Sequence, residues 1–392
     1  MQLQSTSSIS SIGIWAAEKA FHFLLVLAFF LVTCTELVGF QLDKAMMTLM
    51  TGALLFHFII TKKQVPTTSL WALVGYMFFI LSTYSLNLPD SSLIIFFPII
   101  GLAFMFFSSQ EKHLLSILHQ ALFIHILVGI FFVGSSYLVG MNLHVHPMYD
   151  KGLPFLHAAK GFTTTVQAYG TLLISWFLIF YWRQDQNQLK PLDKIAFWIA
   201  ILGLILTFNR NSFLTFYIIM FFRHRKVFVL TLLFAFGFYL YFFEFINKLI
   251  FNISTLSSRA DLLQAFRIAF FERTDWLGYL IGHGNNMVEE SIAKGTLYST
   301  GYIENGTSVL LYTYGFLGYL LYLISVIAFS IILFRKGLTF FGVLFFYIFI
   351  VAQQFTHEFF STTIYILLTG FLLIFQASLT HEKTADRFPS TE

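Results

Sequence analysis

The sequence predicts an all-α polytopic membrane protein. Of its 392 residues, 57% are apolar and 11% are charged, whereas a soluble domain is about half apolar and about a quarter charged. The mean hydropathy is +0.77, and apolar runs recur along the whole chain. So few charged side chains cannot cover a soluble globule of this size. The composition therefore excludes a disordered chain, a nucleic-acid-binding protein and an ordinary soluble enzyme.

Twelve apolar segments are predicted to be transmembrane helices. A span needs about 20 apolar residues, or somewhat fewer where its ends reach the interface, and its backbone must be hydrogen-bonded internally. The first run is followed by no signal-peptide cleavage pattern, so we keep it as a span. We expect one integral membrane domain, 1–392, with spans at 15–37, 45–61, 69–87, 92–109, 114–140, 163–182, 193–208, 212–222, 227–246, 306–334, 338–354 and 359–377.

The positions of the 23 lysine and arginine residues predict the orientation. If the N-terminus is cytoplasmic, the short basic connectors all fall on the cytoplasmic side, among them 62–63, 183–194, 223–226 and 335–336. Basic residues in short loops set membrane orientation, whereas long loops are translocated largely regardless of charge. Both ends of the chain are therefore expected to be cytoplasmic.

Two segments on the opposite side are too long to be turns, namely 141–162 and 247–305. The second is expected to be a large periplasmic loop between the ninth and tenth spans. Within it, SSRADLLQAFRIAFFER has apolar residues at helical spacing after an N-terminal serine. We expect an amphipathic helix that rests on the membrane surface, followed by a glycine-punctuated turn in WLGYLIGHGNN.

The sequence lacks the motifs of several enzyme classes. It has no phosphate-binding loop, no dinucleotide-binding glycine motif, no HExxH zinc motif, no Asp-x-Asp pair and no serine nucleophile elbow. The single cysteine, Cys34, excludes an internal disulfide and a cysteine-based zinc site. His144 and His146 have no acidic partner at ligand spacing. We therefore predict no metal and no cofactor, and a substrate taken from the membrane.

Arginines on the outer side are candidates for binding an anion. Arg210 lies in TFNRNSF between two apolar runs, where a charge is costly unless it is paired or used. It is either an anchor that ends the span or a clamp that grips phosphate with two parallel hydrogen bonds. Arg259 and Arg267 lie near one face of the predicted amphipathic helix. They are either solvated surface charges or two cations for one diphosphate.

Other polar residues lie at the same predicted boundary. Glu304 directly precedes a long span, where it either complements the helix dipole or acts as a general base with a pKa raised by desolvation. Asn305 either caps that helix or hydrogen-bonds a sugar. His357 and Glu358 form an outward-facing polar turn, and Lys160 lies in the first long loop.

Several of these residues fall in motifs that resemble the O-antigen ligase and polymerase superfamily of bacterial inner membranes. Glu304-Asn305, nine residues, Gly315, two residues and Gly318 resemble the superfamily signature, which begins with His-Asn in the ligases. Arg210 after the seventh span is similar to its periplasmic arginine.

Two further motifs extend the resemblance over roughly residues 140–320. Arg259, followed later by Gly282-His283-Gly284, is similar to the second arginine of the superfamily and the glycine turn after it. Lys160-Gly161-Phe162, ahead of Ala168-Tyr169-Gly170, resembles the pattern at the entrance to its middle span.

The resemblance implies a metal-independent, C-type glycosyltransferase fold in the bacterial inner (cytoplasmic) membrane, with an active site that faces the periplasm. The implied donor is a glycan on undecaprenyl diphosphate, and a polysaccharide chain-length regulator is an expected partner. On this hypothesis the catalytic residues are Glu304, Arg210 and Arg259. Substrate-binding roles are expected for Lys160, Arg267, His283, Asn305 and His357.

The leading hypothesis is a polymerase of lipid-linked repeat units, because Glu304 replaces the histidine of the ligases. An O-antigen ligase, which passes the glycan to lipid A-core, is the first alternative. A twelve-span flippase for lipid-linked oligosaccharides is the second. Transporters usually have repeated halves and charges near the membrane midplane, whereas the charges here cluster outside. A structural scaffold would leave the outer arginines unexplained.

Overall fold

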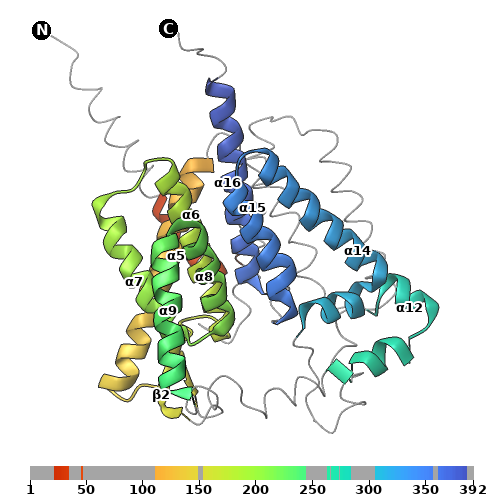
Figure 1. Ribbon diagram of the computed structural model, residues 1–392, viewed down its shortest axis with the longest axis horizontal. Helices are drawn as coiled ribbons and strands as arrows, with labels where there is room; N and C mark the ends of the chain where they lie inside the picture. The colour runs from red at the N-terminus through yellow and green to blue at the C-terminus, as the bar shows by residue number, and fades with distance from the viewer. Residues whose placement is uncertain are drawn as a thin grey trace, which may run out of the picture.

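The computed structural model is a mostly helical bundle (Figure 1) and describes residues 22–34, 46, 111–148, 153–243, 263–264, 266–272, 274–283, 305–355 and 361–385. One group of helices comprises α5 (Glu111–Leu138), α6 (Val166–Asp185), α7 (Pro191–Thr207), α8 (Arg210–Arg223) and α9 (Arg225–Tyr241). A second comprises α14 (Gly306–Arg335), α15 (Thr339–Phe346), with its continuations η3 (Tyr347–Val351) and η4 (Ala352–Gln354), and α16 (Thr362–Ala385). Helix α16 packs against α5 and α6 and so joins the two groups.

From α5 onward, the described helices lie at the segments predicted as spans from 114–140 to 359–377, so these segments are helical as expected. The helix 22–32 lies inside the first predicted span, and 69–87 and 92–109 lie outside the described residues. By length and composition, α5, α14 and α16 contain stretches able to cross a membrane, and two shorter apolar helices accompany them. The fold is therefore that of an all-α membrane protein, and the number of twelve spans stays a prediction.

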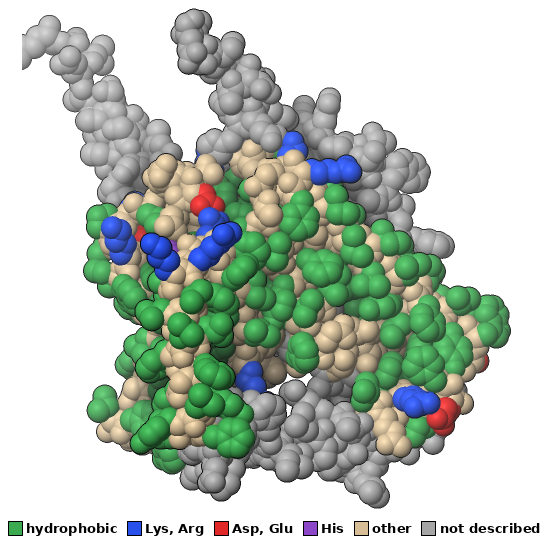
Figure 2. Space-filling model, viewed as in Figure 1, with side chains coloured by type: hydrophobic (Ala, Val, Ile, Leu, Met, Phe, Trp, Pro, Cys, Tyr) green, Lys and Arg blue, Asp and Glu red, His purple; other side chains and the backbone are tan. Residues whose placement is uncertain are grey.

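Apolar side chains cover the outside of the bundle as well as its interior. Helix α6 forms the centre, where Trp176 and Tyr181 are fully buried. By contrast, α9 has no buried residue, and Phe234 on it is 74% exposed. Figure 2 shows apolar side chains over most of the described surface. A soluble monomer does not expose apolar surface on this scale, so these faces fit the hydrocarbon of a bilayer.

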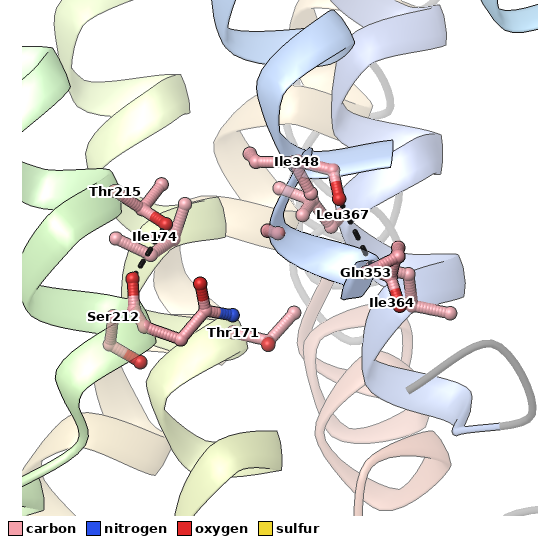
Figure 3. Close-up of a pocket in the computed structure, with 10 residues that line it drawn as sticks. Thr171, Ile174, Ser212, Thr215, Ile348, Gln353, Ile364 and Leu367 are labelled. Atoms are coloured by element: carbon pink, nitrogen blue, oxygen red, sulfur yellow. Dashed lines mark hydrogen bonds between the residues drawn. The ribbon is translucent and has the colours of Figure 1, made fainter. Parts of the chain in front are cut away.

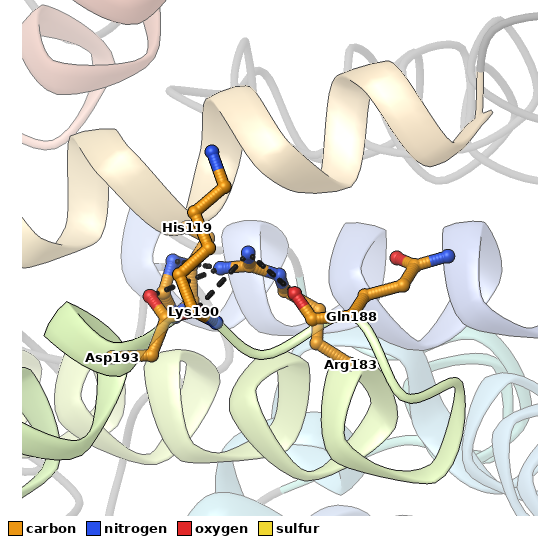
Figure 4. Close-up of polar contacts among 5 residues, drawn as sticks. All are labelled: His119, Arg183, Gln188, Lys190 and Asp193. Carbon is orange, nitrogen blue, oxygen red and sulfur yellow. Dashed lines mark hydrogen bonds and ion pairs between the residues drawn. The ribbon is translucent and has the colours of Figure 1, made fainter.

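A largely buried ion pair fastens the basic end of the first group of helices (Figure 4). Arg183 at the end of α6 pairs with Asp193 of α7, with Nη2 and Oδ2 3.3 Å apart. It also donates to the carbonyl oxygen of Gln188 at 3.2 Å and lies 3.1 Å from Nδ1 of His119 on α5. Asp193 accepts in addition from the backbone N–H of Lys190 at 2.7 Å. One guanidinium therefore connects three helices.

A second pair joins α6 to α8 at the same end. Arg223 donates to both carboxylate oxygens of Asp185, at 2.7 and 2.6 Å. Its guanidinium also lies 4.2 Å from the ring centre of Phe340 at the start of α15. Lysine and arginine side chains gather at the upper end of the view in Figure 2, on the face shown. The described basic connectors 183–194, 223–226 and 335–336 therefore share one end of the bundle.

An antiparallel hairpin lies within the predicted loop 141–162, which the all-α prediction does not include. Its strands are β1 (Val145–Met148) and β2 (Leu153–Ala159), paired with Val145 opposite Ala159. Met148 and Ala158 are buried in a small cluster against which Phe208 packs. The hairpin therefore covers the turn between α7 and α8, because that turn offers an apolar contact.

The second predicted loop contains a helical segment that packs on protein. Phe266, Ala269 and Phe270 have the predicted apolar spacing, and they are buried in one cluster with Val309 and Tyr312 of α14. The segment ends in a π-helix, η2 (Ile268–Glu272). The expectation that this face rests on the membrane surface is therefore wrong for these three side chains, since α14 supplies a closer apolar partner.

The segment predicted as a glycine-punctuated turn begins with a short helix, α12 (Trp276–Ile281). Asp275 caps it by accepting from the N–H of Gly278 at 2.8 Å. The helix ends at Gly282, whose φ of 82° lies in the left-handed region. The N-cap therefore starts a helix that the glycine pattern alone did not predict, and the turn is confined to its end.

Candidate functional site

Arg210 is the first residue of α8, at a tight turn after α7. Phe208 takes a left-handed conformation with φ 48°. The side-chain oxygen of Asn209 then accepts from the N–H groups of Asn211 at 2.9 Å and Ser212 at 3.5 Å. This N-cap satisfies backbone donors that the first turn of a helix leaves free. The predicted turn at Arg210 is confirmed, and the side chain is exposed.

A glycine on α6 sets how closely the start of α8 approaches. A Cβ atom on Gly170 would overlap the side chain of Ser212 and lie 3.7 Å from Nδ2 of Asn209. The preceding Tyr169 is fully buried and donates from its hydroxyl to the carbonyl of Ile126 at 2.9 Å. The Ala168-Tyr169-Gly170 motif therefore fixes the position of the Arg210 turn against α6.

Asn305 caps α14 and also contacts a second helix. Its Oδ1 accepts from the N–H of Ser308 at 3.1 Å, and its Nδ2 donates to the carbonyl oxygen of Gln354 at 3.1 Å. The Gln354 side chain in turn donates to the Thr307 hydroxyl. The capping interpretation of Asn305 is confirmed, and the start of α14 is fastened to the end of η4.

A partly open pocket lies between the start of α8 and the η3–η4 segment to which Asn305 is bonded (Figure 3). It has an empty volume of about 310 Å³, including its mouth. Within the described part of the chain, its lining residues are all uncharged; they are Thr171, Ile174, Asn211, Ser212, Thr215, Ile348, Ala352, Gln353, Ile364 and Leu367. Helices α6, α8 and α16 and the segment η3–η4 each contribute to the wall.

Two amide oxygens at this pocket have no hydrogen-bond partner within the described structure, Oε1 of Gln353 and Oδ1 of Asn211. Gln353 is 2% exposed, and its Nε2 donates to the carbonyl of Ile348 at 3.2 Å. The Thr215 hydroxyl donates to the backbone carbonyl of Asn211 at 2.8 Å, which leaves its own oxygen able to accept. The pocket therefore offers acceptors that a buried donor would satisfy, because an unpaired buried oxygen costs free energy.

The pocket connects two residues that the sequence singled out separately. Asn211, on one wall, directly follows Arg210, while Gln353, on the other, directly precedes the Gln354 to which Asn305 is bonded. Arg210 and Asn305 therefore flank one polar pocket at two helix N-termini. Gln353 was not predicted; the available signal was a pair of amides at the end of an apolar run, where an unpaired polar group is costly.

Lys160 lies just before α6, at the same end as the start of α8. Its carbonyl oxygen accepts from the N–H of Thr163 at 3.1 Å and from the Thr163 hydroxyl at 2.7 Å. Two residues later, Thr165 caps α6 by accepting from Ala168 N–H at 3.0 Å. Lys160 is half-buried. Its position at the entrance to α6 agrees with the motif in which it was found.

His283 joins α12 to α14. Its backbone N–H donates to the carbonyl of Tyr312 at 2.8 Å, and its Nε2 lies 2.8 Å from the hydroxyl of Thr274. That hydroxyl donates to Ala269 at 3.0 Å, so its oxygen accepts from Nε2–H. Burial lowers the pKa of His283, with Asp275 acting in the opposite direction. These contacts give His283 a structural role, and its contact with substrate stays a prediction.

The other candidate residues divide between exposed and undescribed positions. Arg267 is exposed on the segment that packs against α14. Arg259, Glu304 and His357 lie outside the described residues, so the meeting of Arg210, Arg259 and Glu304 stays a prediction. In the part of the chain that the structure describes, no group of three His, Cys, Asp or Glu side chains could hold a metal ion.

Comparison with known proteins leaves the family open. No family model and no curated protein matches this chain. The resemblance to the O-antigen ligase and polymerase superfamily therefore depends on the motifs alone. Gly170, Gly282, Gly315 and Asn305, which belong to those motifs, occupy close helix contacts or a helix cap.

Proposed function

We propose that the chain is a metal-independent glycosyltransferase that polymerises undecaprenyl-diphosphate-linked oligosaccharide repeat units of O-antigen or a related surface polysaccharide. The observation that carries this proposal is the polar pocket between the helix that begins with Arg210 and the η3–η4 segment, to whose end Asn305 is hydrogen-bonded. It opens at one end of an apolar bundle, so a lipid-linked substrate could bind there while its lipid stays in the bilayer.

The charge distribution supports a periplasmic site. Arg183, Arg223 and their neighbours lie at the end of the bundle opposite to Arg210. Under the rule that short cytoplasmic loops are rich in lysine and arginine, this basic end faces the cytoplasm. Arg210 and the pocket then face the periplasm, where a flipped lipid-linked repeat unit would be available.

The proposed chemistry needs a diphosphate clamp and a base. Arg210 would bind the donor diphosphate, helped by the partial positive charge at the start of α8. Arg259 would add a second guanidinium and stabilise the negative charge that develops as the diphosphate leaves. Glu304, directly before the α14 cap, would take the proton of the acceptor hydroxyl as that oxygen attacks the sugar carbon. In-line displacement would invert the configuration at that carbon.

Substitution of the three proposed catalytic residues tests this function. Loss of a positioned base or charge clamp usually costs about 10²–10³ in rate, so Arg210→Ala, Arg259→Ala and Glu304→Ala are each expected to abolish long polysaccharide on a silver-stained lipopolysaccharide gel. Arg335→Ala, at the basic end, is the matched control and should leave the chain-length ladder intact. Wild-type ladders from all three variants, at normal membrane levels, would overturn the proposal.

A deletion strain distinguishes the alternatives. Loss of a polymerase leaves lipid A-core that carries one repeat unit, whereas loss of a ligase leaves lipid A-core that carries none. Loss of a flippase accumulates lipid-linked repeat units on the cytoplasmic face. A polymerase is expected, and in that case a chain-length regulator is an expected partner in the membrane.

A further inference from the structure

The pocket between α8 and η4 has the chemistry of a neutral, hydrogen-bonding site. Its orphan oxygens on Asn211 and Gln353 need donors, and the hydroxyls of Thr171, Ser212 and Thr215 line the same space. A phosphate group carries acceptors rather than donors, and none of the described residues that line the pocket is cationic. The diphosphate is therefore an unsuitable occupant, whereas a hydroxyl-bearing group would satisfy both oxygens.

The apolar walls of the pocket favour a ring over an ion. Its volume of about 310 Å³ includes open space at the mouth, so a ring bound here would lie partly in that mouth. Apolar side chains complete the wall and could contact the C–H faces of a sugar; they are Ile174, Ile348, Ile364 and Leu367. A bare cation would leave these surfaces without a partner.

We propose that this pocket binds one uncharged sugar ring, the ring joined directly to the lipid diphosphate. The proposal rests on the proposed function, because it takes Arg210 as the diphosphate ligand. Asn211 follows Arg210 in the first turn of α8, so a sugar in the pocket and a diphosphate at Arg210 would be neighbours in one substrate. Gln353 is then a specificity-determining residue, since its fixed, buried amide accepts from a sugar hydroxyl.

Sugar binding by the purified full-length protein in lipid nanodiscs tests the subsite. The probes are glucose, galactose, N-acetylglucosamine and N-acetylgalactosamine, followed by saturation-transfer NMR. At least one sugar is expected to bind saturably at millimolar concentration, and Gln353→Leu should weaken it at least tenfold. Thr171→Val removes a hydroxyl at nearly constant side-chain shape and should also weaken sugar binding. This second variant keeps the test valid if Gln353→Leu fails to fold.

Gln376→Leu is the matched control, because it makes the same change on α16, about 13 Å along the helix from Leu367. It should bind the sugar like the wild type. No saturable binding of any probe, or equal binding by wild type and both pocket variants, would overturn the subsite. If sodium chloride stabilises the wild type more than choline chloride does, and Gln353→Leu abolishes this difference, the pocket is an ion site. That result would also overturn the sugar subsite.

The two proposals fail separately. If the Arg210, Arg259 and Glu304 variants lose polysaccharide while Gln353→Leu binds sugar normally, the subsite is wrong and the polymerase stands. If those variants keep their ladders while sugar binding still depends on Gln353, the pocket is a sugar site in a protein of another function.

Discussion

Gly282 and Gly315 meet backbone to backbone at the joint between α12 and α14. A Cβ atom on Gly315 would lie 2.6 Å from the backbone nitrogen of Gly282, and one on Gly282 would overlap the backbone of Thr313 and Tyr314. Gly282 has φ 82° and ψ −176°, and Gly315 has φ 64° and ψ −170°, where α14 is kinked. Only glycine adopts this combination readily. The two glycines therefore hold the second long loop onto the helix that follows Glu304.

Gly315→Ala and Gly282→Ala are expected to destabilise the protein by about 3 kcal/mol or more, because each adds backbone strain and a steric overlap. Thermal unfolding in detergent measures the loss. Gly337→Ala is the matched control: its φ is also positive, at 71°, but nothing lies within 4 Å of the added Cβ. It should cost only about 1 kcal/mol, and equal losses at all three positions would contradict the close contact.

Gly170→Ala is expected to displace the start of α8 from α6, because its Cβ would overlap Ser212. The polysaccharide ladder should shorten or disappear on the lipopolysaccharide gel, since the Arg210 turn moves with Ser212. The double variant Gly170→Ala/Ser212→Gly removes the overlapping side chain and should restore the ladder in part. A normal ladder in Gly170→Ala would show that this close approach is not required.

Acid should loosen the joint at His283. Because burial lowers its pKa in the folded protein, His283 binds a proton at a lower pH there than in the unfolded chain, where it does so near pH 6.5. The contribution of His283 to stability is therefore complete above about pH 6.5 and falls as the pH drops below that value. Hydrogen–deuterium exchange of 276–283, corrected for the intrinsic rate, should be faster at pH 5.5 than at pH 7.5.

His283→Gln provides the control for this pH effect. Glutamine keeps an N–H donor for the Thr274 hydroxyl but does not titrate in this range. Exchange in the variant should therefore be the same at both pH values. An equal acid effect in the variant would assign the loosening to another group.

Breaking each of the two ion pairs at the basic end should lower the free energy of unfolding by a different amount. Arg183 and Asp193 have side chains 12% and 13% exposed, so Asp193→Asn leaves a nearly buried guanidinium without its counter-charge. About 3–5 kcal/mol is expected for breaking a buried pair in this way. Asp185, the partner of Arg223, is 38% exposed, so Asp185→Asn should cost about 1 kcal/mol or less. Unfolding midpoints in detergent compare the two, and the reverse order would contradict the burial argument.

Local features of the site could be predicted from the sequence. Arg210 lies at the expected turn because Asn209 follows an apolar run and caps the next helix. Asn305 caps α14 for the same reason. N-caps are predictable because a short polar side chain reaches only its own next turn. The expectation for the apolar face of 266–272 failed because α14, distant in the chain, packs against it. The start of α12 was missed although it depends on a local N-cap, Asp275.

The sequence by itself determined that the protein is a bundle of apolar helices, where the described spans lie, and which connectors are basic. These properties depend on the free energy of transferring each segment from water to lipid. That free energy is nearly the sum of the contributions of the residues within the segment. The tertiary structure alone decided that Asn211 and Gln353 line one pocket and that Gly282 lies against Gly315. Such pairings depend on how helices distant in the chain pack, and that packing is selected by shape complementarity over the whole bundle.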